Sequence, residues 1–230
     1  MRALLSLIIL LNFGYITFGQ TTEVITVKAG QSLYDIHREI YRYPNFKDGK
    51  VYFLEGGLSA GKLNYSFIAE AMQFISPTGD TLSLADEATI KYITIENDTF
   101  YYDKGYLEGL INAGTVKLAI KQKIKFKDKY KIGAFGTASP TVRTENEKNY
   151  MGDNRYNLII AEDLIFVKEK EYYLNVRFRD FVLINKKNLI KLFPKQKDNI
   201  ESYLKENNIN LRIENDLKKL MQYLVSSGSV

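Results

Sequence analysis

The alternation of hydrophobic and polar positions marks out the middle of the chain. Between residues 49 and 184, apolar residues recur at every second position in short runs, separated by turn-forming groups such as Pro77-Thr78-Gly79-Asp80. Successive side chains of a strand point to opposite faces, so this pattern predicts many short strands. We therefore expect an antiparallel β-rich body, folded as a sandwich or a partly closed barrel.

Helical spacing replaces this alternation on both sides of the body. Residues 20–48 contain a short apolar run and then a helical pattern that begins at Ser32 and ends at Pro44. Residues 185–226 contain three helical patterns, the first with Asn185 as a candidate N-cap. The apolar stripe of the last helix consists of Leu217, Leu220, Met221 and Leu224. The expected fold class is α+β, with a short N-terminal helix and a C-terminal helical tail.

The first 19 residues have the three parts of a secretory signal peptide. Arg2 is the positive charge, residues 3–13 are nearly all apolar, and Thr17 and Gly19 are the small residues before a cleavage site. The apolar run is shorter than the roughly 20 residues that span a membrane. We therefore expect a cleaved signal peptide, a periplasmic or secreted location, and a soluble mature chain without a transmembrane span.

Composition excludes several kinds of chemistry. The 230 residues contain no cysteine, so disulfides, thiolate metal sites, thiol nucleophiles and a lipoprotein anchor are excluded. His37 is the only histidine, so one chain cannot form a histidine metal cluster. The formal net charge of +5 is modest for a nucleic-acid partner. We expect no cofactor and no metal.

A phosphate-binding pattern occurs at residues 56–62, which read G-x-x-x-x-G-K. A P-loop needs Ser or Thr next, to hold magnesium, and Leu63 stands there instead. The glycines are therefore interpreted as part of a hairpin turn.

Lysines occupy every second position between residues 121 and 131. On a regular strand they would share one face over roughly 33 Å, with mostly apolar residues on the other face. The functional interpretation is a stripe that binds polyanions such as an acidic polysaccharide. The alternative is a solvated strand face on which lysine prevents edge pairing. The candidate binding residues are Lys121, Lys123, Lys125, Lys127, Lys129 and Lys131.

Carboxylates offer an enzymatic alternative. A pair of Asp or Glu side chains can act as acid and base in glycoside hydrolysis. Asp80, Glu162 and Asp163 flank expected strands and are the candidates for such a pair, although residues of this kind are usually solvated turn positions. This alternative makes the chain a hydrolase of envelope polymers.

Residues 27–36 (VKAGQSLYDI) resemble the front half of a LysM module, with its strand, glycine and helix opening. The resemblance implies binding to N-acetylglucosamine polymers such as peptidoglycan. The second helix and closing strand of that family are missing or too short before Lys50, so the implied module is degenerate.

A broader set of segments resembles a group of exported Bacteroidetes proteins of unknown function. The group has no known activity or catalytic residues, so the resemblance implies none here. The segments are 49–53 (GKVYF), 62–65 (KLNY), 72–75 (MQFI), 79–82 (GDTL), 99–102 (TFYY), 192–195 (LFPK) and 200–205 (IESYLK).

These observations favour a non-enzymatic exported protein with a binding or structural role. Its expected parts are a signal peptide (1–19), a strand–helix segment (20–48), a β-rich body (49–184) and a helical tail (185–226). The expected partner is an envelope protein or an anionic polysaccharide rather than nucleic acid.

Overall fold

The computed structural model describes residues 23–132, 138–140, 159–177 and 180–227. The expected signal peptide and residues 133–137, 141–158 and 178–179 of the expected β-rich body lie outside these residues. The described part is a β-rich α+β fold with helices at its C-terminal end, as predicted.

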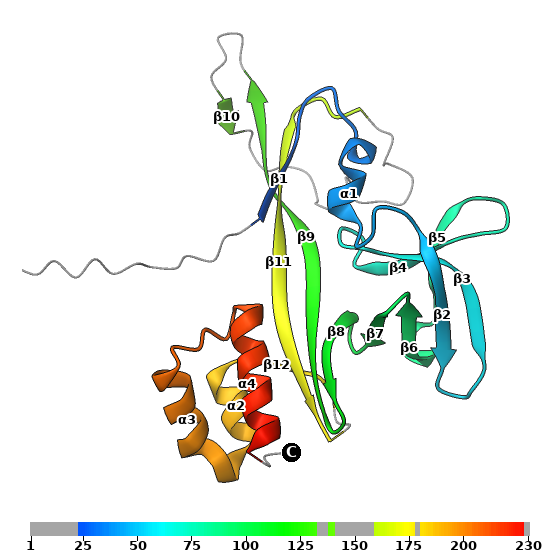
Figure 1. Cartoon of the computed structure of the whole chain (residues 1–230). Coiled ribbons are helices and arrows are strands. Elements are labelled where there is room, and N and C mark those ends of the chain that lie inside the picture. Colours follow the sequence, from blue (N-terminus) through cyan, green and yellow to red (C-terminus); the bar gives the residue numbers. More distant parts are fainter. Residues whose placement is uncertain (1–22, 133–137, 141–158, 178–179, 228–230) are drawn as a thin grey trace, which may run out of the picture.

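Within the described residues, twelve strands form one antiparallel sheet (Figure 1). The strand order is β1-β11-β9-β8-β7-β6-β2-β3-β4-β5, with β10 beside β9 and β12 beside β11. The strands therefore form a single open sheet. The sequence had predicted a sandwich or a partly closed barrel. The strands are β1 (Glu23–Val27), β2 (Lys47–Phe53), β3 (Leu58–Ser66), β4 (Ala71–Ile75), β5 (Thr81–Ser83), β6 (Ile90–Ile95), β7 (Asp98–Tyr102), β8 (Tyr106–Ala113), β9 (Val116–Ile132), β10 (Ala138–Pro140), β11 (Asp163–Val176) and β12 (Val182–Leu183).

The sheet bends until the end of β3 reaches β9. β8 pairs with β9 only as far as Ile120. Beyond that point the Ile124 N–H donates to Phe67 O at 2.8 Å, and the Tyr65 hydroxyl donates to Gln122 O at 3.2 Å. The bend encloses a first core, which includes the fully buried side chains Ile93, Phe100 and Phe166.

The C-terminal helices enclose a second core against the other end of β9 and β11. They are α2 (Lys186–Leu192), α3 (Lys197–Glu206) and α4 (Glu214–Ser226), and Figure 1 shows them together beside the lower end of the long β9–β11 strand pair. Asn185 caps α2 as predicted, because its Oδ1 accepts from the Asn188 N–H at 2.8 Å. The predicted stripe of α4 is buried in this core.

One face of β9 contributes to both cores. Val116, Leu118 and Ile120 lie in the second core, whereas Ile124 and Phe126 lie in the first. All five share a face by the alternation of the strand, and the twist of a long strand turns that face from one core to the other.

The N-terminal segment belongs to the same sheet. β1 pairs with β11 over its whole length. A 3-10 turn (Leu33–Ile36) and one helical turn, α1 (His37–Ile40), follow it. Both the backbone N–H and the hydroxyl of Ser32 donate to Asp35 Oδ2, at 2.6 and 3.1 Å, so Asp35 closes this turn.

The G-x-x-x-x-G-K pattern forms the hairpin that the sequence predicted, rather than a P-loop. Gly56 and Gly57 form the turn between β2 and β3 with φ of 94° and 84°, a region that glycine adopts without strain. Gly61 and Lys62 lie within β3, so no helix follows the glycines as a P-loop requires.

Neighbouring residues of α4 test the second core. Leu224 is fully buried, whereas Val225 is 45% exposed. We expect Leu224→Ala to lower the free energy of unfolding by about 2–5 kcal/mol, because it leaves a cavity. Val225→Ala should change it by less than about 0.5 kcal/mol. Urea unfolding measures both, and equal losses would contradict the packing described.

Two glycines that oppose each other across β2 and β3 make a second test. A Cβ at Gly49 would lie 2.8 Å from Leu63 Cδ1 and 2.9 Å from Thr94 O, whereas a Cβ at Gly61 meets nothing within 4 Å. Gly49→Ala should therefore destabilise the protein by about 1–3 kcal/mol. Gly61→Ala should be neutral or stabilising, since alanine loses less backbone entropy than glycine. Thermal unfolding of the two variants measures both effects. A larger loss of stability in Gly61→Ala than in Gly49→Ala would refute the assigned register of β2 and β3.

Candidate functional site

Lys121, Lys123 and Lys125 lie on one face of β9, together with glutamates of β11. Glu171 opposes Lys121 and Glu169 opposes Lys123. Lys123 Nζ lies 3.6 Å from Glu169 Oε2 and 3.5 Å from Glu171 Oε1, and Lys125 Nζ lies 3.3 Å from Glu169 Oε2. We call these five residues the Lys–Glu ladder.

The ladder lysines differ in their exposure to solvent. The Lys123 side chain is 13% exposed and that of Lys121 is 17% exposed, with its Nζ 3.5 Å from Glu70 Oε2. Lys125 is 50% exposed, and its hydrogen bond to Glu169 raises the pKa of its ammonium group. Glu70, Glu169 and Glu171 thus balance the three lysines, and only Lys125 presents much of its side chain to solvent.

A β-bulge ends the shared face after Lys125. Phe166 opposes Phe126, whereas Leu164 opposes Lys129, so β9 carries one extra residue between these pairs. Directly opposed residues of antiparallel strands share a face, and an extra residue shifts the alternation by one. Lys129 therefore lies on the face of Phe126, opposite to the face of Lys125.

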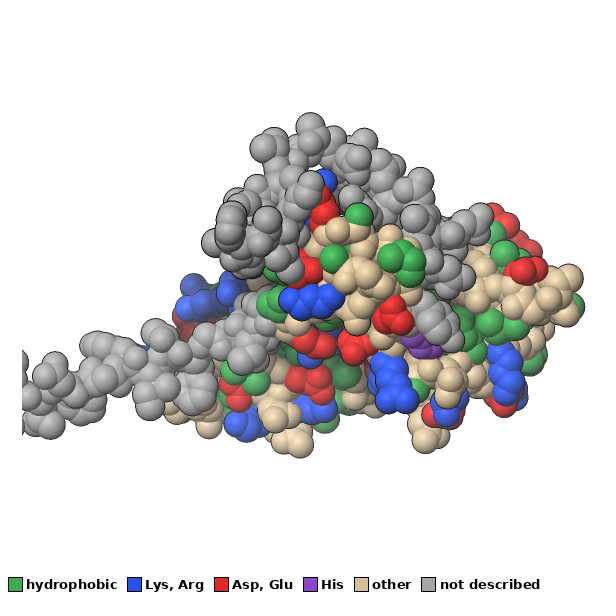
Figure 2. Space-filling view, turned by 90° about the horizontal axis from the view of Figure 1, so that it is seen from above, with side chains coloured by type: hydrophobic (Ala, Val, Ile, Leu, Met, Phe, Trp, Pro, Cys, Tyr) green, Lys and Arg blue, Asp and Glu red, His purple; other side chains and the backbone are tan. Residues whose placement is uncertain are grey.

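The prediction of six lysines on one face is wrong for this reason. Lys129 lies with its Nζ 3.7 Å from Glu162 Oε2 and is 16% exposed. Lys127 lies at the bulge and is exposed. The side chain of Lys131 lies outside the described residues. Figure 2 shows basic and acidic side chains interspersed on the described part of the face it presents, without a single basic area.

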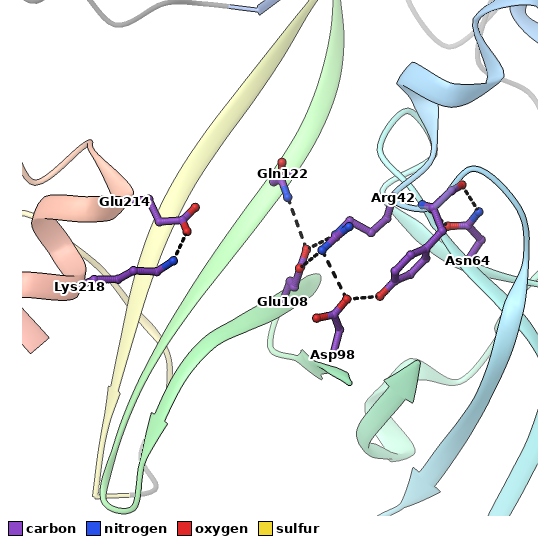
Figure 3. Close-up of polar contacts among 8 residues, drawn as sticks. Arg42, Asn64, Asp98, Glu108, Gln122, Glu214 and Lys218 are labelled. Carbon is purple, nitrogen blue, oxygen red and sulfur yellow. Dashed lines mark hydrogen bonds and ion pairs between the residues drawn. The ribbon is translucent and has the colours of Figure 1, made fainter. Parts of the chain in front are cut away.

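A second charged cluster surrounds Arg42, which the sequence analysis missed. Its Nε donates to Glu108 Oε2 at 2.8 Å and its Nη2 to Glu108 Oε1 at 2.7 Å. Asp98 Oδ2 lies 3.4 Å from the same Nη2 and accepts from the Tyr43 hydroxyl at 2.6 Å. Figure 3 shows these side chains converging from β7, β8 and the segment before β2.

Neighbouring polar groups support the Arg42 cluster. Gln122 Nε2 lies 3.5 Å from Glu108 Oε2. Asn64 binds the backbone of Tyr43, because its Oδ1 accepts from the Tyr43 N–H at 3.1 Å and its Nδ2 donates to Tyr43 O at 2.9 Å. These contacts give the polar groups around Arg42 hydrogen-bond partners, as polar groups shielded from water require.

The contacts of the Arg42 cluster raise the pKa values of Arg42 and Tyr43. The hydrogen bonds that Arg42 donates to Glu108 raise the pKa of Arg42, and burial followed by the hydrogen bond to Asp98 raises the pKa of Tyr43. Arg42 and Tyr43 therefore stay protonated at neutral pH. A bidentate pair of this kind fixes geometry rather than moving a proton. One signal in the sequence was available: Glu108 is the single charged residue within β8.

Lys168 on β11 is a further buried charge that the sequence analysis did not single out. Its side chain is 13% exposed, and its Nζ lies 4.0 Å from the centre of the Phe67 ring and 3.9 Å from Glu23 Oε1. Burial lowers the pKa of this ammonium group. Its contacts join β1 and the β3–β4 turn to β11.

The predicted carboxylate candidates lie in separate structural contacts. Asp163 accepts from the Ala29 N–H at 2.8 Å and from Lys28 Nζ at 3.0 Å, so it fastens the end of β1 to β11. Glu162 pairs with Lys129, and Asp80 accepts from the Thr78 hydroxyl at 2.6 Å in the exposed β4–β5 turn.

His37 lies against an aromatic side chain. The His37 ring lies 4.7 Å from that of Tyr41, and burial lowers its pKa. Among the described residues, no group of three or more His, Asp or Glu side chains is arranged to hold a metal ion.

The contacts of Asp163 predict a pH dependence. The Ala29 N–H and then Lys28 lower the pKa of Asp163 below its ordinary value. A lowered carboxyl pKa stabilises the fold above the ordinary value, about 3.9, and this stabilisation is lost as the pH falls through the lowered pKa. Asp163→Asn should therefore be less stable than wild type at neutral pH, with the difference shrinking below pH about 4.

Asp80→Asn, in an exposed turn, is the control for the Asp163 variant. Guanidinium unfolding between acid and neutral pH measures both variants. A gap between wild type and Asp163→Asn that is constant over the whole range would contradict the assigned role of Asp163.

No helix within the described residues is long and apolar enough to cross a membrane. Comparison with family models, with curated proteins and with solved structures finds no match to this chain, so the sites rest on the contacts described above.

Proposed function

We propose that the chain is a non-enzymatic exported protein of the periplasm or the secreted fraction, with a binding or structural role. The observation that carries the proposal is the engagement of its charged residues in contacts that join neighbouring strands of the sheet. Asp163 joins β1 to β11, the Lys–Glu ladder joins β9 to β11, and Arg42 joins Glu108 of β8 to Asp98 of β7.

The carboxylates favour this proposal over a hydrolase. A general acid or base must exchange a proton with substrate during each turnover. Glu108 is held by two hydrogen bonds from Arg42, and Asp163 is held by a backbone N–H and a lysine. Carboxylates that accept two strong hydrogen bonds in this way are suited to structure rather than to proton transfer.

The integration of β1 favours it over a LysM-like module. Residues 23–27 form an edge strand of the main sheet, and Gly30 N donates to Ile160 O at 2.8 Å. The segment that resembles LysM thus supports the body of this protein. The proposed binding role does not use it as a separate module.

Within this role we place the polyanion contact at Lys125 and Lys127, the exposed part of the predicted lysine stripe. Lys125 is half exposed and Lys127 is exposed at the bulge, whereas Lys121 and Lys123 are shielded and balanced by glutamates. A polyanion at this end competes with Glu169 for Lys125. Such a contact weakens with salt, because exposed charges are screened.

Retention on an immobilised sulfated polysaccharide tests this contact. We expect Lys125→Gln combined with Lys127→Gln to elute at lower salt than wild type, and Glu169→Gln to elute at higher salt because it frees Lys125. Lys50→Gln combined with Lys91→Gln removes the same charge from exposed positions on β2 and β6. Equal loss of retention in the two double variants would show a net-charge effect and refute the site.

A further inference from the structure

The first half of β3 has an open outer edge. β2 pairs with β3 from Leu58 onward, but β4 pairs only with residues 63–66. Within the part of the chain that the structure describes, no backbone group bonds to the outer side of residues 58–62. All five of these residues are exposed.

The direction of the backbone groups on this edge follows from neighbouring hydrogen bonds. Gly57 O accepts from the Phe53 N–H at 3.4 Å, and Tyr65 O accepts from the Arg42 N–H at 2.9 Å. Both oxygens belong to odd-numbered residues and point toward the β2 side. Backbone groups alternate in direction along a strand of an antiparallel pair. The even-numbered residues Leu58, Ala60 and Lys62 therefore direct their N–H and C=O groups to the open edge.

This edge carries few of the features that block strand pairing. Proteins protect open edges with charged side chains, lysine above all, or with proline or bulges. Here Ser59, Ala60 and Gly61 are small, and Lys62 is drawn to its own chain by Asp48, with Nζ and Oδ1 2.9 Å apart. Leu58 beside this edge is 57% exposed.

We propose that the open edge of β3 pairs antiparallel with the same edge of a second copy, about a two-fold axis at Ala60. Ala60 then opposes Ala60 of the second copy, and Leu58 opposes Lys62. Every outward N–H and C=O of the three residues finds a partner, because outward residues meet outward residues.

The side chains are self-complementary in this register, as a two-fold interface requires. The small residue Ala60 lies on the axis, where two strands must approach closely, with Ser59 and Gly61 on either side. The two Lys62 ammonium groups lie at opposite ends of the pairing, so like charges do not meet. The aliphatic part of each Lys62 covers the exposed Leu58 of the second copy. The inference is independent of the polyanion contact, which lies on β9.

The absence of cysteine from the chain allows a direct test. Opposed residues that exchange hydrogen bonds have Cα atoms about 5.5 Å apart, within the range for a disulfide. We expect Ala60→Cys to form a covalent dimer on mild oxidation, seen by non-reducing electrophoresis. Lys91→Cys, exposed on β6 two strands away, is the control and should stay monomeric.

Light scattering after size exclusion adds a second measurement. Wild type should show about twice the molar mass of Ala60→Pro, because proline removes the outward N–H at the axis but none of the bonds to β2. Ala60→Ser keeps that N–H and should remain dimeric. Circular dichroism checks that each variant is folded. A monomeric wild type whose Ala60→Cys variant cross-links no faster than Lys91→Cys would overturn the proposal, as would a monomer that instead binds an extended peptide at this edge.

Discussion

The pairing of β9 with β11 is the interaction on which the rest of the structure depends. The two strands pair from Val116 opposite Val176 to Tyr130 opposite Asp163. Because one face of β9 lines both cores, this strand pair joins the bent sheet to the helical tail. Neither core is complete without it, since the helices of the second core pack on the same two strands.

The two cores meet at a polar junction on that face. Gln122 stands between Ile120 of the second core and Ile124 of the first, and its amide reaches Glu108 beside Arg42. A buried carboxylate is costly unless it is paired, and the bidentate contact with Arg42 satisfies both of its oxygens. The cluster thus allows the charged residue Glu108 to lie at the junction of the two cores.

The opposite face of β9 shows how register decides the role of charged residues. Lysines at alternate positions would make a basic surface if no acidic residues lay beside them. In the structure, β11 places Glu169 and Glu171 opposite two of them, and the bulge moves Lys129 to the other face. Opposite charges across a strand pair support pairing, so the lysines mainly stabilise the pairing of β9 with β11.

Local periodicity determined much of this protein from the sequence alone. The alternation of apolar residues predicted an antiparallel β-rich body, and the stripe ending at Leu224 predicted the last helix, because a strand and a helix each impose their own repeat on the chain. Asn185 was recognisable as a cap for the same local reason. The tertiary structure alone decided which distant groups meet. Arg42 and Glu108 are 66 residues apart, and a single bulged residue redirected Lys129, because contacts and register depend on the partner strand rather than on the repeat within one strand.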